Sequence, residues 1–428
     1  MTPAPMGPPR VHVVGAGLAG LACAVALALK GRPVHLYEAA GQAGGRARSF
    51  ADATLDRRID NGNHLLLSGN RSVFRFLDAI GARDRLVGPR ESRFPFMDLR
   101  TGRRWVVRIG PGRWPGWVFD PARRVPDTRP ADYLAGLRLA RAGARATVAD
   151  VLGGLGPLYD RFWHPLAVSA LNTEAERAQA RLLWPVLTET FGRGGRACRP
   201  LWAREGLSET FVRPALGALS ARAATVRFGC RLKDLEAVDG RVTRLVFPDG
   251  TEEIARGEAV ALAVPPWAAN LLLPGLKAPD ETRPIVNLHF RLPNPPPARF
   301  AQPLGLLGGT AEWLFLRGDV ASVTISAAGH VVDLPPDAIA APVWPEIARA
   351  LGWPADTPQP PVKVIKEKRA TFAQTPEQVA RRPGPRGPLR NLVLAGDWTD
   401  TGLPATIEGA VRSGHRAAET VIAVQRAP

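Results

Sequence analysis

The sequence predicts an α/β fold in which a Rossmann-like, dinucleotide-binding domain is interleaved with a second domain of α+β type. Two observations lead to this fold class. An apolar run at 11–14 is followed by a Gly-x-Gly-x-x-Gly motif and an Ala/Leu-rich stretch from 18 to about 29, the order of strand, glycine turn and helix. A second apolar run, at 34–37, ends in the acidic Glu38. Together these segments make a complete βαβ unit.

Each part of this unit has a physical task in binding a dinucleotide. We expect Gly15 to permit the tight turn, Gly17 to let the backbone approach a pyrophosphate, and Gly20 to allow close packing of helix on strand. The helix N-terminus offers free N–H groups to phosphate. Glu38, about 20 residues after the motif, is placed to accept hydrogen bonds from ribose hydroxyls. The candidate cofactor-binding residues of this unit are Gly15, Ala16, Gly17, Leu18, Ala19, Gly20, Glu38 and Ala39.

Two further segments favour FAD over a nicotinamide cofactor. Gly44, Gly45 and Arg46 follow the second strand, where a flavin pyrophosphate needs a second cradle and a positive charge. Near the C-terminus, an expected strand at 391–394 leads into Gly396 and Asp397 and then into small residues that open a helix. This segment adds the candidates Gly396, Asp397, Ala405, Thr406 and Glu408. No Cys or His stands in an evident linkage motif, so we expect the FAD to be bound non-covalently.

Length and composition set limits on the class of protein. A chain of 428 residues with 45% hydrophobic content predicts two domains with large cores. The net charge is +17 and 50 of the 56 basic residues are Arg, yet no nucleic-acid-binding module is recognisable, so an anionic membrane surface is the better partner. Three scattered cysteines predict neither disulfides nor a metal site. Without a long apolar run or a signal sequence, we expect a cytoplasmic protein bound peripherally to the inner face of the membrane.

The flavin domain is expected to be discontinuous. It would comprise 10–95, 205–265 and 388–428, and the substrate-binding, membrane-facing domain would comprise 96–204 and 266–387. Within the latter, the segment 105–129 mixes Trp and Phe with several Arg, a combination suited to a membrane interface. An amphipathic helix is expected to follow at 131–146 and to lie in the same interface.

The βαβ unit, the Gly-Gly-Arg segment and the C-terminal Gly-Asp segment together resemble the FAD-binding domain of the flavin amine oxidase and phytoene desaturase superfamily. More discriminating stretches include Asp-Asn-Gly-Asn-His at 60–64, Trp-His-Pro-Leu at 163–166, Leu-Asn-Thr at 171–173 and Val-Asn-Leu-His at 286–289. With these, nearly the whole chain resembles the hydroxysqualene dehydroxylases, FAD enzymes of bacterial squalene and hopanoid biosynthesis.

The resemblance implies an amine-oxidase-type fold and reductive removal of the hydroxyl of hydroxysqualene, a C30 isoprenoid, to give squalene. Loss of the allylic hydroxyl leaves an allyl cation, which hydride from reduced flavin would quench. The resemblance places the 60–64 loop at the flavin ring, so Gly62 and Asn63 join the cofactor candidates, and it places Leu232 at the adenine. His64 is the candidate for assisting departure of the hydroxyl, because histidine titrates near neutrality, with Asn63 beside it. The candidates for lining the substrate cavity are His164, Asn172, Asn287, His289 and Trp313.

Three other functions compete with this interpretation. A desaturase acting on a squalene-like or carotenoid polyprenoid would use the same fold in the oxidative direction. An amine oxidase is disfavoured, since 3 Tyr and 6 Lys supply little material for an aromatic cage or a lysine-bound water. A prenyl-protein carrier without flavin would not retain both phosphate cradles. The electron donor, either NAD(P)H or another protein, is not identified by any motif.

Overall fold

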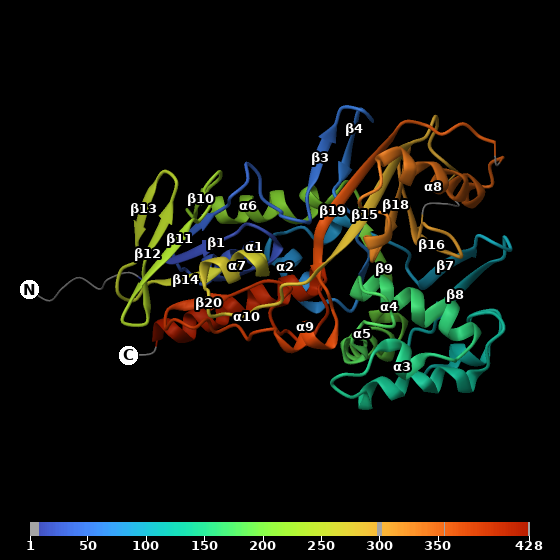
Figure 1. The fold of residues 1–428 in the computed structure, drawn as a ribbon, viewed down its shortest axis with the longest axis horizontal. Coiled ribbons are helices and arrows are strands. Elements are labelled where there is room, and N and C mark those ends of the chain that lie inside the picture. Colours follow the sequence, from blue (N-terminus) through green and yellow to red (C-terminus); the bar gives the residue numbers. More distant parts are fainter. Residues whose placement is uncertain (1–7, 298–301, 355, 427–428) are drawn as a thin grey trace, which may run out of the picture.

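The computed structural model describes residues 8–297, 302–354 and 356–426 (Figure 1). At its centre lies a five-stranded sheet in which every neighbouring pair is parallel. The strand order is β10 (Thr225–Arg227), β2 (Val34–Tyr37), β1 (Val11–Val14), β14 (Ala259–Leu262) and β20 (Leu392–Leu394). The sheet therefore gathers strands from three widely separated parts of the chain.

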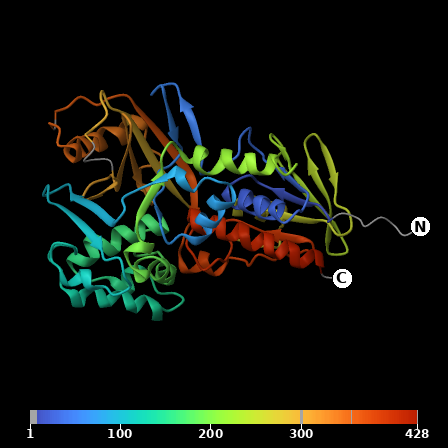
Figure 2. The ribbon, with the colours of Figure 1, turned by 180° about the vertical axis from the view of Figure 1, so that it is seen from behind.

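Both faces of this sheet are buried, as its uninterrupted apolar strands require. Alternate residues enter different cores, with Val13 and Leu36 on one side and Val14 and Tyr37 on the other. The first side is covered by helices, of which α1 and α10 run side by side in both views (Figures 1 and 2). These helices are α1 (Leu18–Leu29), α2 (Arg71–Ala79), α6 (Arg213–Ser220) and α10 (Ile407–Arg426).

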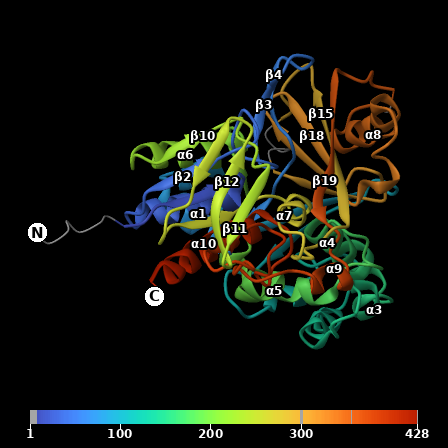
Figure 3. The same cartoon turned by 60° about the vertical axis from the view of Figure 1, so that its left-hand side comes forward.

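An antiparallel three-stranded ribbon covers the other side of the parallel sheet (Figure 3). Its strands are β11 (Asp234–Val238), β12 (Arg241–Phe247) and β13 (Gly250–Glu253). Asp239 and Gly240 form its first turn, and both have positive φ, as a tight hairpin of this kind needs.

A seven-stranded, mainly antiparallel sheet forms the second layer of the molecule. Its strand order is β19 (Val362–Phe372), β15 (Thr282–Arg291), β18 (Val320–Ile325), β17 (Trp313–Arg317), β16 (Leu304–Leu307), β7 (Ser92–Asp98) and β8 (Arg104–Ile109). Helix α8 (Pro336–Leu351) packs on one face of this sheet through an apolar core, which leaves the opposite face available to line a cavity.

Smaller elements connect these layers. Short strands lie between the two sheets: β3 (Ser49–Asp52), β4 (Arg57–Asp60), β5 (Leu66–Leu67), β6 (Leu86–Val87) and β9 (Pro200–Ala203). Helices α4 (His164–Leu171), α5 (Leu183–Glu189) and α7 (Pro266–Leu272) each contribute residues to this cavity. Helix α3 (Val148–Leu152) lies at the end of the molecule remote from the termini, and the short helix α9 (Pro376–Ala380) follows β19 (Figure 1). Within the described residues, no helix combines the length and hydropathy that crossing a bilayer requires.

The helix expected at 131–146 is present, but it is of the 3₁₀ type and ends earlier than expected. The segment forms a 3₁₀ helix over Pro130–Arg141. Its buried residues are Ala135, Gly136 and Leu139, whereas Leu134 and Leu137 are 65% and 60% exposed. Gly136 lies so close to the indole of Trp163 that a Cβ there would meet the ring at 2.9 Å. This packing leaves no room for a side chain at position 136 unless the ring moves.

Candidate active site

One large cavity of about 1400 Å³ runs between the parallel sheet and the seven-stranded sheet. Ordinary small-molecule pockets hold roughly 300–1,000 Å³, so this cavity has room for more than one ligand. One end is formed by the glycine turn after β1 and the segments that follow β2 and β20. The other end is a chamber lined mainly by apolar side chains, among them Phe94, Phe96, Phe162, Leu166 and Trp313.

The three glycines of the motif differ in what surrounds them. Gly15 has φ of +104°, and a Cβ there would lie 2.6 Å from the Ala263 carbonyl oxygen. At Gly20, a Cβ would lie 1.8 Å from the Gly15 oxygen, so a side chain is excluded by the packing of helix on turn. At Gly17, a Cβ would meet nothing within 4 Å and would project into the cavity. Gly17 thus leaves open a space that a side chain would fill.

A second backbone segment closes around this space. Gly44 forms an isolated parallel bridge with Gly17, and the Gly44 N–H donates to the Ala16 carbonyl at 2.8 Å. A Cβ at Gly45 would lie 3.3 Å from the Gly17 Cα. Two glycine backbones therefore face each other across the N-terminus of α1, whose first N–H groups have no partner within the helix. The open space and the unpaired N–H groups fit a pyrophosphate.

Glu38 lies at the end of β2, at the rim of this space. Its two carboxylate oxygens accept the N–H groups of Ala16 and Ala40, each at 2.8 Å, which fixes the side chain beside the glycine turn. Ala39 and Leu232 line the same end of the cavity. A carboxylate held at this position faces the space where the ribose of a bound dinucleotide would lie.

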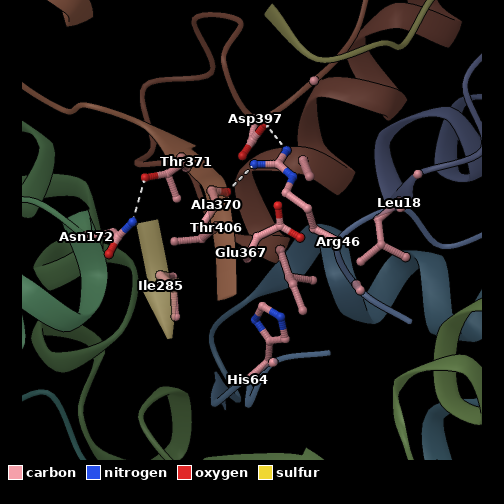
Figure 4. Close-up of a pocket in the computed structure, with 18 of the residues that line it drawn as sticks. Leu18, Arg46, His64, Asn172, Ile285, Glu367, Ala370, Thr371, Asp397 and Thr406 are labelled. Atoms are coloured by element: carbon pink, nitrogen blue, oxygen red, sulfur yellow. Dashed lines mark hydrogen bonds and ion pairs between the residues drawn. The ribbon is translucent and has the colours of Figure 1, made fainter. Parts of the chain in front are cut away.

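Arg46 and Asp397 meet in the middle of the cavity, although 351 positions separate them in sequence (Figure 4). The guanidinium donates to Asp397 at 2.7 Å and to the Ala370 carbonyl at 2.5 Å. Burial lowers the pKa of Arg46, but the Asp397 carboxylate outweighs burial and leaves that pKa above its usual value. A permanent positive charge therefore lies near the space that fits a pyrophosphate.

The start of α10 also borders the cavity. Thr406 lines it and caps the helix, its hydroxyl accepting the Gly409 N–H at 3.1 Å. Glu408 is buried and accepts the N–H groups of Ser72 and Val73 at 3.0 and 2.9 Å. The Glu408 side chain thus caps the N-terminus of α2, while Gly396, Ala405 and Thr406 present small groups to the cavity.

The loop at 60–64 is fixed to the seven-stranded sheet by amide hydrogen bonds. The Asn63 side chain donates to the Thr324 hydroxyl at 3.2 Å, and the Asn287 side chain donates to the Asn61 carbonyl at 3.4 Å. Asp60 is occupied by Ser49, Leu207 and Arg317, which makes it a structural residue.

His64 projects from this loop into the cavity (Figure 4). Burial lowers its pKa to about 4, with Arg46 acting in the same direction and Asp60 opposing. The expectation that His64 titrates near neutrality is therefore wrong. At neutral pH its imidazole is uncharged, so it can accept or donate a hydrogen bond but holds no additional proton.

The five substrate-cavity candidates separate into two groups. Asn172, Asn287 and Trp313 line the cavity, whereas His164 and His289 are not among its lining residues. His289 is buried and bonds to the Ser322 hydroxyl at 2.7 Å. His164 lies at the start of α4, with its ring 5.8 Å from that of Tyr159.

The lining asparagines are held in place by their own hydrogen bonds. Asn172 ends α4 in a left-handed conformation, donates to Thr371 at 3.0 Å and accepts the Ala327 N–H at 2.7 Å. Its amide thereby joins α4 to β19 and to the end of β18. Trp313 donates to the Ser169 hydroxyl at 2.9 Å, which fixes the orientation of its indole in the chamber wall.

Sequence reasoning missed Glu367, whose side chain projects into the cavity between Arg46 and His64 (Figure 4). It stands in a charged run, Lys366-Glu367-Lys368-Arg369, which has the composition of a solvated strand. The side chains of a strand alternate between its two faces, and this alternation was the available signal. It does not reveal which of the two faces lines a cavity.

The residues present fit FAD. The space opposite Gly17 and Gly45 accepts a pyrophosphate, Glu38 is placed for a ribose, and the Arg46–Asp397 pair lies farther along the same cavity. An extended dinucleotide that begins at Glu38 would bring its ring system to the 60–64 loop.

Comparisons with known proteins agree with this geometry. The model of the flavin-containing amine oxidoreductase family matches residues 18–422, so the chain belongs to that family. Among solved structures, cyclohexylamine oxidase from Brevibacterium oxydans shares the fold, with a TM-score of 0.71 at 16% identity over 97% of this chain and 98% of that chain. FAD is accordingly the cofactor.

Sequence relatives give a finer placement. The chain is 49% identical to hydroxysqualene dehydroxylase from Rhodopseudomonas palustris and 48% identical to that from Sinorhizobium fredii, over 97% of this chain and 99% of each relative. The chain thus stands among the hydroxysqualene dehydroxylases of its family. A probable zeta-carotene desaturase from Synechococcus elongatus is a distant relative at 24% identity over 97% of this chain and 99% of that relative.

Proposed function

We propose that the protein removes the hydroxyl of hydroxysqualene reductively and releases squalene. The observation that carries this proposal is the single cavity, in which a dinucleotide cradle opens into a large apolar chamber. The high identity to hydroxysqualene dehydroxylases over nearly the full length supports it. When bound and reduced, FAD supplies a hydride to the carbon that carried the hydroxyl.

The chamber suits a substrate that is almost entirely hydrocarbon. Phe94, Phe96, Phe162 and Leu166 offer apolar surface, and burial of a long isoprenoid against them is worth about 25 cal/mol per Å² of apolar area. A filled chamber excludes water, which protects an allyl cation from being trapped as the alcohol again.

His64 would serve in this reaction as a neutral hydrogen-bond partner. Its imidazole projects from the 60–64 loop, where the substrate hydroxyl would approach the flavin ring (Figure 4). Asn63 and Asn287 support the same position by fixing the loop to the sheet. We assign these residues to orienting the hydroxyl.

Desaturation of a squalene-like or carotenoid polyprenoid is the second candidate, because the same cavity would hold either substrate. The relation to a zeta-carotene desaturase favours it, but at half the identity. Two incubations distinguish the candidates. Dithionite-reduced protein with hydroxysqualene should give squalene and oxidised flavin, whereas oxidised protein with squalene should give no dehydrogenated product. The reverse pattern would identify a desaturase.

We further propose that the protein collects its substrate at an anionic membrane surface. Trp114, Phe119, Leu134 and Leu137 are each at least 60% exposed. They belong to two adjoining segments, joined where the Trp117 and Tyr133 rings lie 5.3 Å apart. Exposed arginines accompany them at positions 108, 113, 138, 141 and 145. Aromatic and basic side chains together suit the headgroup layer. Flotation with vesicles containing phosphatidylglycerol tests this proposal, and binding should weaken as salt rises.

The reaction needs a source of electrons. We propose that NAD(P)H or an electron-donor protein reduces the flavin, because each turnover consumes two electrons. Anaerobic mixing of the oxidised protein with NADPH tests the first alternative, since direct reduction bleaches the flavin spectrum. A spectrum that does not change would favour a protein donor.

A further inference from the structure

Glu367 faces the cavity because of the register of β19. It pairs with Ile285 on β15, and residues directly opposite each other on neighbouring strands project to the same side. Ile285 and Asn287 both line the cavity, so the Glu367 side chain enters it too. Lys366 and Lys368 also border the cavity, but their ammonium groups are held elsewhere: Lys366 donates to the Leu334 carbonyl, and Lys368 pairs with Asp333 at 2.7 Å.

The Glu367 carboxyl group differs from the other carboxyl groups that line the cavity. Those of Glu38, Glu189, Asp397 and Glu408 are each bound by backbone N–H groups or by an arginine. Glu367 makes no hydrogen bond or ion pair with any residue in the described ranges of the chain. Its hydrogen-bonding capacity is therefore available to a molecule in the cavity.

Glu367 lies between two other polar side chains of the cavity. It projects between Arg46, which lies beside Asp397, and His64, which lies on the loop expected to face the flavin ring (Figure 4). Arg46 is hydrogen-bonded to Asp397 and to the Ala370 carbonyl, and its charge also interacts with the Glu367 carboxyl group, with no hydrogen bond between the two side chains. His64 is neutral at physiological pH and holds no proton to give beyond its one N–H.

We propose that Glu367 is the acid that protonates the leaving hydroxyl of the substrate. This inference rests on the proposed function. The carbon–oxygen bond breaks, its electron pair stays with oxygen, and the Glu367 proton converts that oxygen to water. Bound reduced FAD would supply the hydride that the carbon takes up and would be oxidised in doing so. Alcohol, hydride and proton thus give hydrocarbon and water, and Glu367 is left ionised.

The Glu367 side chain is half-buried, so it meets water while the chamber is empty. A long hydrocarbon chain that fills the chamber would remove this water and leave the substrate hydroxyl as the polar group in the cavity next to Glu367. Each turnover consumes one proton from solvent.

The test compares two leaving groups in Glu367→Gln. With hydroxysqualene, the reduced variant should reoxidise its flavin 10²–10⁴-fold more slowly than the unmodified protein, the usual effect of losing a general acid. The acetate ester of hydroxysqualene releases acetate, which departs without a strong acid. With this ester, the variant should react within a few-fold of the unmodified protein, and Glu367→Asp should recover part of the rate with the alcohol.

The controls separate this role from a structural one. Lys363→Gln alters a charged side chain of the same strand that pairs with Asp52 at 3.1 Å and is not among the residues that line the cavity, so this variant should react with the alcohol at the unmodified rate. FAD content and melting temperature of Glu367→Gln should match those of the unmodified protein. Equal loss with alcohol and ester, or no loss with either, would overturn the proposal. If the unmodified protein yields no squalene, the proposed function itself fails, and this result does not depend on Glu367.

Discussion

Replacing Gly17 or Gly20 with alanine gives a matched pair of perturbations within one motif. At Gly20 the new methyl group would lie 1.8 Å from the backbone oxygen of Gly15, a contact that only backbone movement can relieve. Overpacking of this kind costs about 1–3 kcal/mol. At Gly17 the methyl group would meet no protein atom within 4 Å, and the backbone φ of −68° is open to alanine. Gly17→Ala should therefore change folding stability by less than about 1 kcal/mol, the usual range for an N-cap substitution.

FAD binding should respond in the opposite order. The Gly17 methyl group would occupy the space we assign to the pyrophosphate, and we expect affinity to fall at least about 100-fold, or about 2.7 kcal/mol. Thermal unfolding of the apoproteins and titration with FAD by fluorescence measure the two effects separately. Gly17→Ala should melt near the unmodified apoprotein and bind FAD weakly, whereas Gly20→Ala should melt lower. If Gly17→Ala binds FAD normally, the pyrophosphate does not lie against this glycine and the reasoning is refuted.

Three further perturbations test the charges and the surface. Burial lowers the pKa of His64 to about 4, against 6.5 in an unfolded chain, so folding stability should fall as the pH drops from 6.5 towards 4. At pH 5 the loss of stability is up to about 2 kcal/mol. His64→Gln should remove this pH dependence, which a comparison of melting temperatures at pH 5 and 7 measures. Asp397→Asn leaves the Arg46 charge without its carboxylate and should weaken FAD binding about 10-fold or more, as measured by equilibrium dialysis. Trp114→Ser combined with Leu134→Ser removes exposed apolar surface and should reduce vesicle binding several-fold in flotation. Turnover of detergent-dispersed substrate should not change. Flotation equal to that of the unmodified protein would refute the membrane proposal.

Local patterns predicted the dinucleotide end of the molecule well. The strands at 11–14 and 34–37 and the helix beginning at Leu18 lie where the apolar runs and glycines indicate, because each is specified by a few adjacent residues. The assignment of FAD relied on segments that the fold brings together, as Arg46 and Asp397 show. The division into a flavin domain and a substrate domain stays a prediction.

The substrate chamber was less predictable because its lining depends on strand register. Asn287 and His289 stand two positions apart on β15 and alternate with Leu288, yet Asn287 lines the cavity and His289 bonds to Ser322 outside it. A bulge at 283–285 shifts the pairing of β15 with β19, which brings Glu367 opposite Ile285. The pKa of His64 likewise follows from burial beneath distant segments, which its neighbours in sequence do not reveal.

A single turnover in D₂O tests the central claim most directly. Reduced protein would be mixed anaerobically with hydroxysqualene, and the extracted squalene analysed by mass spectrometry while flavin absorbance is followed. The hydride that reduced flavin transfers exchanges with solvent beforehand, so each squalene should carry one deuterium at the carbon that bore the hydroxyl. One oxidised flavin should appear for each squalene formed. Unlabelled squalene, or a flavin that stays reduced without product, would contradict reductive dehydroxylation by the bound FAD.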